Sequence, residues 1–362
     1  MISIIRSDKS WIESEAVEQL EKLSQLKGMV RAVGMPDLHP GKTPVGAAFI
    51  TEKYIYPHIA GNDIGCGMAL FTADVNKKKF KIDKTIKALE KLENLQEVYI
   101  DYEEGLDNFL YKDKLGTIGG GNHFAEFQEI NQVFDEEALD NIGIDKSNVL
   151  LLVHSGSRNF GEYILQKHLS QYDSQNGLEE GSNSFNAYIS DHAAAVEYAR
   201  INREMVACRI FKHLNIASYT KALDSVHNSI TVRTIAGVKY YIHRKGAAPA
   251  DVNYVVVAGS RGSKSYIVKP IADSEKYGFS ISHGAGRKWP RSSCKERLES
   301  VYSKKNIKNK QMQFNLICAD KKLIYEEAPE AYKDIDKVME DMLKENMVKV
   351  IASLNPMITY KG

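Results

Sequence analysis

Four histidines of this chain lie in short polar or glycine-rich segments that are far apart in the sequence. They are His123 in GGGNHF, His154 in VHSGSR, His227 in VHNS and His283 in SHGAGR. A fifth segment, GNDIGCGM, supplies Asp63 and Cys66. No single helix or strand explains this spacing, so we expect distant loops to bring the side chains together. The pattern is typical of a metal site, with one histidine left over for a second task.

The predicted metal ligands combine one carboxylate, one thiolate and three imidazoles. They are Asp63, Cys66, His123, His154 and His227. Thiolate and imidazole favour zinc, whereas the carboxylate also suits manganese or iron. Glycines 61, 65 and 67 allow the backbone to bend so that Asp63 and Cys66 point into one cavity. Three ligands and an open position would make one catalytic ion. Five candidates indicate two ions, with the cysteine sulfur able to bridge them.

Taken singly, each of these residues has an ordinary structural interpretation. A lone cysteine is more often a small buried apolar residue, which is how we interpret Cys208, Cys294 and Cys318. Four other histidines are expected to be surface or internally hydrogen-bonded residues: His58, His168, His192 and His213. Spacing alone does not separate a catalytic metal site from a structural one.

Several loops resemble anion-binding sites. GTIGGGNHF has four glycines whose backbone N–H groups can approach a phosphate, and Arg158 in HSGSRNFG precedes an expected helix start. GSRGSKSY offers three serines, and HGAGRKWPR places Arg287 and Arg291 after His283. One such loop alone is typical of a solvated turn. Together, on a chain of net charge +1, they predict a focused positive site rather than a generally basic surface.

The composition is that of a globular protein with a core, since 43% of 362 residues are hydrophobic and 26% charged. Four cysteines do not make a disulfide framework, and the N-terminus does not resemble a signal peptide. No segment approaches the roughly 20 apolar residues that a membrane span needs. We therefore expect a reduced cytoplasmic protein with no membrane association.

The hydrophobic pattern predicts one α+β domain over residues 1–362, with the site at its centre. Helices are expected at 14–25, 84–95, 191–213 and 331–354, and a mobile loop at 172–186. Strands are expected at 149–153, 229–235, 238–244, 254–260 and 265–270. The strand 149–153 is expected to be buried, and it ends at His154.

These segments in their order resemble the RtcB family of RNA-splicing ligases. The resemblance runs from about Gly34 to Gly362 through GMPDLHPGK, GNDIGCGM, GGGNHFAEFQ, VHSGSRNFG, VHNS, HRKGAAPA, GSRGSKSY, SHGAGR and the terminal KG. It implies central mixed or antiparallel β-sheets surrounded by helices. The combination of DIGCGM and SHGAGR is highly specific, whereas the glycine loops individually are not.

The resemblance also implies a reaction. Family members use two manganese ions, Mn(II), and GTP. A histidine forms a covalent adduct with GMP, and the GMP passes to an RNA 3′-phosphate, which arises by hydrolysis when the end is a 2′,3′-cyclic phosphate. The 5′-OH of the second RNA end then attacks, and GMP leaves. By this resemblance His283 is the nucleophile, and Asp63, Cys66, His123, His154 and His227 hold the metals.

The same resemblance assigns the remaining site residues. Those expected to contact the nucleotide are Asn122, Glu126, Ser260, Ser265 and Lys361, and those expected to face RNA phosphates are Arg158, Arg287 and Arg291. The chain departs from the family pattern at GSRG, where Arg261 replaces a methionine and puts the preference for GTP in question. HRKGAAPAD and GSRGS resemble the branch associated with a release-factor-H-type protein, which would direct the enzyme to RNA of stalled ribosomes.

Two other functions remain open on the residues alone. A metal-dependent phosphoesterase or cyclic-phosphate hydrolase would use the same ligands without joining RNA. A non-catalytic RNA- or ribosome-binding protein would need only a structural metal, and the complete ligand set with a spare histidine argues against it.

Overall fold

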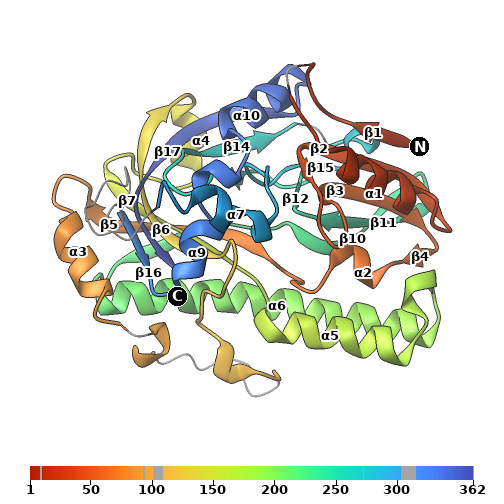
Figure 1. Ribbon diagram of the computed structural model, residues 1–362, viewed down its shortest axis with the longest axis horizontal. Coiled ribbons are helices and arrows are strands. Elements are labelled where there is room, and N and C mark those ends of the chain that lie inside the picture. Colours follow the sequence, from red (N-terminus) through yellow and green to blue (C-terminus); the bar gives the residue numbers. More distant parts are fainter. Residues whose placement is uncertain (9, 93, 101–108, 272, 303–314, 362) are drawn as a thin grey trace.

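The computed structural model describes the chain except for residues 9, 93, 101–108, 272, 303–314 and 362. Two large sheets form its centre, and helices cover them (Figure 1). The larger sheet has the order β13 (Val255–Val257), β14 (Ser265–Pro270), β17 (Val348–Lys361), β6 (Phe124–Val133), β7 (Asn148–Ser155), β5 (Gly67–Asn76) and β9 (Tyr219–Val226), and β16 (Asn315–Cys318) pairs with β17 in parallel. The other neighbours in this sheet are antiparallel.

The smaller sheet has the order β1 (Ile2–Ile4), β2 (Met29–His39), β3 (Val45–Glu52), β11 (Val238–Lys245) and β10 (Asn228–Ile235). Only β1 and β2 pair in parallel. Two short antiparallel pairs complete the strands: β12 (Ala247–Pro249) with β15 (Ser280–Ser282), and β4 (Tyr54–Ile55) with β8 (Leu178–Glu179). The predicted α+β class with mixed and antiparallel sheets is confirmed.

The helices lie on the outside of these sheets. They are α1 (Ser14–Ser24), α2 (Pro57–Ala60), α3 (Ile82–Leu89), α4 (Glu136–Asn141), α5 (Arg158–Gln171), α6 (Asn183–His213), α7 (Arg291–Leu298), α9 (Lys321–Glu326) and α10 (Ile335–Lys344). In Figure 1, α6 runs along the lower side of the molecule with α5 beside it, and it contacts strands of both large sheets. Within the described ranges, no helix has the length and apolar composition that a bilayer span requires.

Most predicted elements are present. The helix expected at 14–25 is α1, and the apolar run 149–153 lies within β7, whose side chains are almost all buried. The four later strand predictions correspond to β10, β11, β13 and β14. A helix does begin directly after HSGS, as α5.

The prediction of a helix over 331–354 is wrong. The helix α10 ends at Lys344, Asn346 adopts a left-handed backbone, and the chain continues as the long strand β17. Asparagine is one of the few residues that accept this conformation after a helix. β17 lies between β14 and β6, and this pairing on both sides decides the structure of a segment whose apolar residues also fit a helix.

Two further boundaries differ from the predictions. The expected helix 84–95, which includes the undescribed residue 93, is α3 and ends at Leu89, while Asn94 caps a separate turn by accepting a hydrogen bond from the backbone N–H of Gln96. The segment 172–186 is not wholly a loop. It contains β8, and α6 already begins at Asn183, where the Ser182 hydroxyl accepts the N–H of Phe185.

Candidate active site and metal centre

The topology of the larger sheet brings the predicted ligands to one edge. The turn of Asp63 and Cys66 enters β5, and His123 directly precedes β6. His154 is near the end of β7, and His227 follows the end of β9. Because β6, β7, β5 and β9 are neighbours and alternate in direction, two strand starts and two strand ends meet at the same edge.

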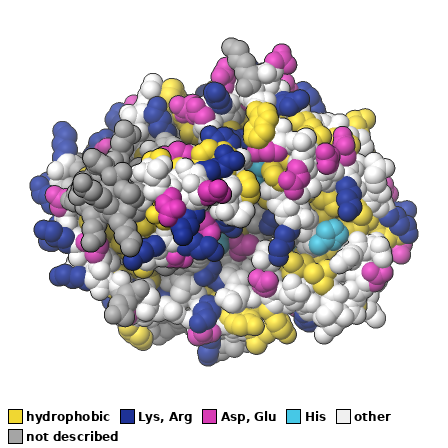
Figure 2. All heavy atoms as spheres, in the orientation of Figure 1, with side chains coloured by type: hydrophobic (Ala, Val, Ile, Leu, Met, Phe, Trp, Pro, Cys, Tyr) yellow, Lys and Arg dark blue, Asp and Glu magenta, His cyan; other side chains and the backbone are white. Residues whose placement is uncertain are grey.

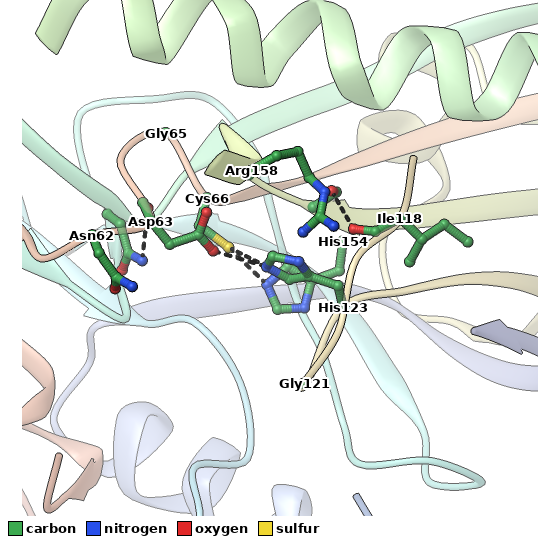
Figure 3. A network of polar contacts seen from close by, with 12 residues as sticks. Asn62, Asp63, Gly65, Cys66, Ile118, Gly121, His123, His154 and Arg158 are labelled. Carbon is green, nitrogen blue, oxygen red and sulfur yellow. Dashed lines mark hydrogen bonds and ion pairs between the residues drawn. The ribbon is translucent and has the colours of Figure 1, made fainter. Parts of the chain in front are cut away.

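All five predicted ligands are brought together there. The sulfur of Cys66 lies 3.3 Å from Nε2 of His123 and 3.3 Å from Nε2 of His154. Nε2 of His154 lies 3.3 Å from Nε2 of His227, and Nε2 of His123 lies 2.8 Å from Oδ2 of Asp63. Figure 3 shows the carboxylate and the sulfur pointing at the rings of His123 and His154.

The donor atoms form two groups of three that share the sulfur. One is Cys66, His154 and His227, and the other is Asp63, Cys66 and His123, with donor atoms in each group within 4.8 Å of one another. Soft thiolate, borderline imidazole and hard carboxylate donors crowded in this way fit transition-metal ions. Each group could hold a cation, and Cys66 is common to both.

Burial keeps the imidazoles suited to bind cations. It lowers the pKa of His154 and of His227 well below the usual value, so both rings are neutral at pH 7. Burial also raises the pKa of the Cys66 thiol. For Asp63, burial opposes ionisation, but the charge and hydrogen bond of His123 outweigh it and hold the pKa below the usual range. A bound cation would favour the thiolate as well.

The fourth histidine lies beside this cluster but is held by another residue. The ring centroids of His283 and His227 are 4.7 Å apart. Nδ1 of His283 bonds to Oδ2 of Asp37 at 2.7 Å, and the same oxygen accepts the backbone N–H of His283 at 3.3 Å. An ionised carboxylate only accepts hydrogen bonds, so Nδ1 carries the proton and Nε2 carries the free lone pair. Asp37 is fully buried.

Two polar residues of α6 hold the loops of the site. Nη1 of Arg203 donates to the carbonyls of Gly65, at 2.9 Å, and Ser155, at 3.0 Å. Nδ2 of Asn202 donates to the hydroxyl of Ser155 at 2.9 Å and to the carbonyl of Thr117 at 3.0 Å. Arg203 also pairs with Asp224 of β9. Through these bonds, one helix fixes three loops that meet at the candidate metal cluster, which is Asp63, Cys66, His123, His154 and His227.

The glycines of GTIGGGNHF make room for arginines. A Cβ at Gly119 would lie 1.8 Å from Nη1 of Arg158, and one at Gly121 would lie 2.8 Å from Nη2 of Arg291. Arg158 itself has a left-handed backbone, with φ of 55°, which is costly for a residue that carries a side chain. The small glycines of this loop therefore leave space for the guanidinium groups of Arg158 and Arg291 beside the cavity. This role is separate from the predicted contact of the loop's backbone N–H groups with phosphate.

One cavity of about 1150 Å³ collects these residues. Its lining includes the metal cluster, His283 and most of the predicted nucleotide and RNA contacts, namely Asn122, Glu126, Ser260, Lys361, Arg158, Arg287 and Arg291. Ser265 is not among the lining residues of the described chain. Its hydroxyl accepts hydrogen bonds from Gln128 and from the N–H of Gly259, so it supports the cavity wall.

The residues predicted to contact the nucleotide include a buried acid, Glu126, and a buried amine, Lys361. Glu126 accepts hydrogen bonds from Gln128 at 2.6 Å and Thr359 at 2.5 Å, and burial raises its pKa to about 7. Nζ of Lys361 donates to the carbonyls of Gly121 and His123, and burial lowers its pKa to about 8. Arg261 is buried nearby and donates to the carbonyl of Ile324 at 2.9 Å.

The two arginines after His283 differ in their surroundings. The side chain of Arg287 is only 15% exposed, and its guanidinium contacts Glu327 and donates to the carbonyls of Trp289 and Glu326. The side chain of Arg291 is 47% exposed and pairs with Glu327 at 3.0 Å. Figure 2 shows lysine and arginine side chains gathered near the centre of this face, over α7 and α9.

Sequence reasoning did not assign Asp37, Asn202 or Arg203. Asp37 lies in GMPDLHPGK, where the signal is a carboxylate between the apolar residues Met35 and Leu38 of a strand. Asn202 and Arg203 are adjacent polar residues in a long helix, and both side chains are fully buried. A buried charge inside a regular element requires a partner, but the sequence does not say which one.

The chain matches the family model described as tRNA-splicing ligase RtcB over residues 19–103 and 89–362. It is 43% identical to the RNA-splicing ligase RtcB2 of Escherichia coli strain ATCC 25922, covering 99% of this chain and 95% of the relative. Identity is 28% to the tRNA-splicing ligase RtcB of Nanoarchaeum equitans, over 100% and 93% of the two chains. It is also 28% to the RNA-splicing ligase RtcB of Escherichia coli K12, over 97% and 95%.

Proposed function

The chain belongs to the RtcB family of RNA-splicing ligases, and from this premise we propose that it joins broken RNA ends using GTP and Mn(II). In this proposal an RNA 3′-phosphate, or a 2′,3′-cyclic phosphate after hydrolysis, is joined to a 5′-OH. The observation that carries it is the cavity in which His283, oriented by Asp37, faces the five clustered ligands. Because that cavity is lined by residues from Trp11 to Lys361, we treat 1–362 as one catalytic unit.

His283 would act as the nucleophile through Nε2. Asp37 holds the proton on Nδ1 and leaves the Nε2 lone pair to attack the α-phosphate of GTP, which forms a covalent histidine–GMP and releases pyrophosphate. The carboxylate also stabilises the positive charge that develops on the ring during attack. A Cβ at Gly246 would lie 3.0 Å from Cε1 of His283, so the absent side chain there leaves space at the ring.

Asp63, Cys66, His123, His154 and His227 would hold two Mn(II) ions. When bound, the ions would neutralise phosphate charge as it shifts from one oxygen to another. Lys361 and Glu126 would bind the nucleotide, helped by Asn122 and Ser260, with Ser265 supporting the wall. Arg158 and Arg291 would contact RNA phosphates, and Arg287 would act mainly by holding the wall.

The free thiols of all four cysteines suit a reducing compartment, so we place the enzyme in the cytoplasm. Within the family, HRKGAAPAD and GSRGS support a functional link to a release-factor-H-type protein and a role in repair of ribosomal RNA. Competition between cleaved ribosomal RNA and cleaved tRNA in one ligation reaction tests that substrate preference. Equal use of both would remove the proposed specialisation.

The proposed reaction is tested by incubating the protein with Mn(II) and GTP labelled in the α-phosphate. We expect a labelled covalent adduct that maps to His283 and is lost in His283→Ala. His213→Ala is the matched control, because His213 lies outside the cavity lining and bonds only the carbonyl of Ala88 among its described contacts. An adduct that survives His283→Ala would contradict the proposal.

An RNA assay separates the alternatives. A phosphoesterase or cyclic-phosphate hydrolase would convert 2′,3′-cyclic ends to 3′-phosphate without joining them. A non-catalytic RNA-binding protein would bind the ends without changing them, and Cys66→Ala would leave that binding intact. The ligase is supported only by a joined product that requires both GTP and a 5′-OH end.

A further inference from the structure

His39 is a cavity histidine outside the metal cluster. Five histidines line the cavity: His39, His123, His154, His227 and His283. Three of them belong to the groups of candidate metal ligands, and His283 is bound to the carboxylate of Asp37. His39 is the remaining one, and it has no part in metal binding or in the proposed guanylation step.

His39 lies two residues from Asp37 at the end of β2, and it lines the same cavity as His283. The pairing of β2 with β3 is irregular between Gly34 and His39, so strand alternation does not set the directions of these side chains. Leu38, between them, packs instead into the hydrophobic cluster under α1. Asp37 contacts both histidines, with its carboxylate on His283 and its backbone carbonyl on His39.

The hydrogen bond to Asp37 determines which nitrogen of His39 carries the proton. Nδ1 of His39 lies 2.8 Å from the backbone carbonyl oxygen of Asp37. A carbonyl oxygen can only accept, so Nδ1 is the donor and Nε2 of the neutral ring has a free lone pair. Burial lowers the pKa of His39 to about 4, which keeps the ring neutral at pH 7. Among the described residues, none donates a hydrogen bond to that Nε2.

Two buried structural histidines, His192 and His243, are arranged differently. Nε2 of His192 accepts the backbone N–H of Ile230 at 3.0 Å, and Nε2 of His243 accepts that of Tyr56 at 2.9 Å. Their lone pairs hold helix α6 to β10 and β11 to the start of α2. The ring of His39 has one nitrogen held by the backbone and the other at the cavity, which is the arrangement of a histidine that accepts a proton from a ligand.

We propose that His39 is the general base that takes the proton from the 5′-OH of the incoming RNA end in the joining step. This inference rests on the proposed ligase function. The 5′ oxygen forms a bond to the phosphorus of the activated RNA 3′-phosphate, and the bond from that phosphorus to the GMP oxygen breaks. GMP leaves with the electron pair, and the hydroxyl proton moves to Nε2 of His39 and then to solvent. RNA phosphates in the cavity favour this transfer, because negative charge stabilises the imidazolium.

The test separates the joining step from the guanylation step. In His39→Asn, the amide N–H can still donate to the carbonyl of Asp37, but no basic nitrogen remains. We expect adduct formation with GTP within about threefold of wild type, whereas joining slows by roughly 10²- to 10⁴-fold. RNA carrying GMP on its 3′-phosphate should accumulate, and imidazole added to His39→Gly should restore part of the joining rate. His213→Asn is the matched control, because His213 also bonds a backbone carbonyl but lies outside the cavity lining.

Each other outcome contradicts the proposal. Joining by His39→Asn at the wild-type rate would exclude a base at this position. If His39→Asn slows guanylation and joining equally, or if His39→Asn and His39→Gly both lose the adduct, His39 only positions Asp37 and His283. Adduct formation also shows that a variant is folded. If the wild-type protein forms no adduct, the proposed ligase function is wrong. A defect confined to joining in His39→Asn tests only the role of His39.

Discussion

Asp37 and His283 are 246 residues apart in the sequence, yet one carboxylate oxygen of Asp37 accepts both the ring and the backbone N–H of His283. This pair joins the small sheet, through β2, to the loop after β15. It orients the proposed nucleophile and fixes its tautomer. A single buried carboxylate thus controls the direction in which the Nε2 lone pair points.

Removing the charge of Asp37 should slow guanylation. In Asp37→Asn, the amide can hold His283 in the wrong tautomer and cannot stabilise the charge that develops on the ring. We expect the rate of adduct formation to fall roughly 10²- to 10⁴-fold. Single-turnover labelling with GTP measures the rate, and thermal unfolding reports whether the fold is intact. An unchanged rate in a folded variant would show that Asp37 does not orient the nucleophile.

Substitutions in the metal cluster should remove ions unequally. Asp63→Ala and His227→Ala each affect one group of three, so each should lower the metal content from about two ions per chain to about one. Cys66→Ala affects both groups and should lose most of both ions. Elemental analysis of metal-loaded protein measures this, with Cys208→Ala as the control thiol. Equal losses in all three variants would argue against a bridging sulfur.

Binding of GTP should be strongest between about pH 7 and pH 8. Glu126 accepts N–H groups of the nucleotide more strongly when it is ionised, so affinity should rise with pH up to its pKa of about 7. Lys361 binds phosphate more strongly as the charged ammonium, so affinity should fall above its pKa of about 8. On either side of this range, affinity should change by at most about tenfold per pH unit. Equilibrium binding to His283→Ala avoids turnover, and a flat profile would exclude these two groups.

Glu126→Gln should separate binding from stability. The folded-state pKa of Glu126 is raised, so the group favours the fold at low pH, and that contribution is lost as the pH rises through about 7. The variant should therefore unfold at no lower temperature than wild type at pH 8. Its affinity for GTP should nevertheless fall, and that affinity should no longer rise with pH below about pH 7. Lower thermal stability at pH 8 would instead assign Glu126 to the core.

Adjacent glycines should differ in their tolerance of alanine. A Cβ at Gly119 would collide with Arg158, and Gly119 has a φ of 103°, whereas a Cβ at Gly120 would meet nothing within 4 Å. Gly119→Ala should therefore displace Arg158 and slow RNA joining by roughly tenfold to a hundredfold. Gly120→Ala is the matched control and should join RNA normally. Similar rates for the two variants would show that Arg158 does not need this space.

Arg287→Ala and Arg291→Ala should have different consequences. Arg287 is largely buried and bonded to two carbonyls and Glu327, so its loss should cost about 2–4 kcal/mol of unfolding free energy. Arg291 is half exposed, so Arg291→Ala should lower the free energy of unfolding by less than about 1 kcal/mol. The same substitution should lower the affinity for RNA. Denaturant unfolding and RNA binding measure the two effects. Strong RNA binding by Arg291→Ala would remove it from the RNA surface.

The sequence by itself determined the kinds of atoms in the site. Asp63, Cys66, His123, His154, His227 and His283 were predicted as site residues from residue type and local glycine-rich context, and local patterns also indicated α1, β7 and most later strands. The tertiary structure decided what local patterns do not contain. Pairing on both sides made a central strand of β17, and the alternation of β6, β7, β5 and β9 brought four loops to one edge. The partners of buried charges, such as Asp37 with His283 or Arg203 with Gly65 and Ser155, also depend on contacts between distant segments. Such contacts are specified by the packing of the whole chain, because a buried polar group can be satisfied by any partner that the fold brings within hydrogen-bonding distance.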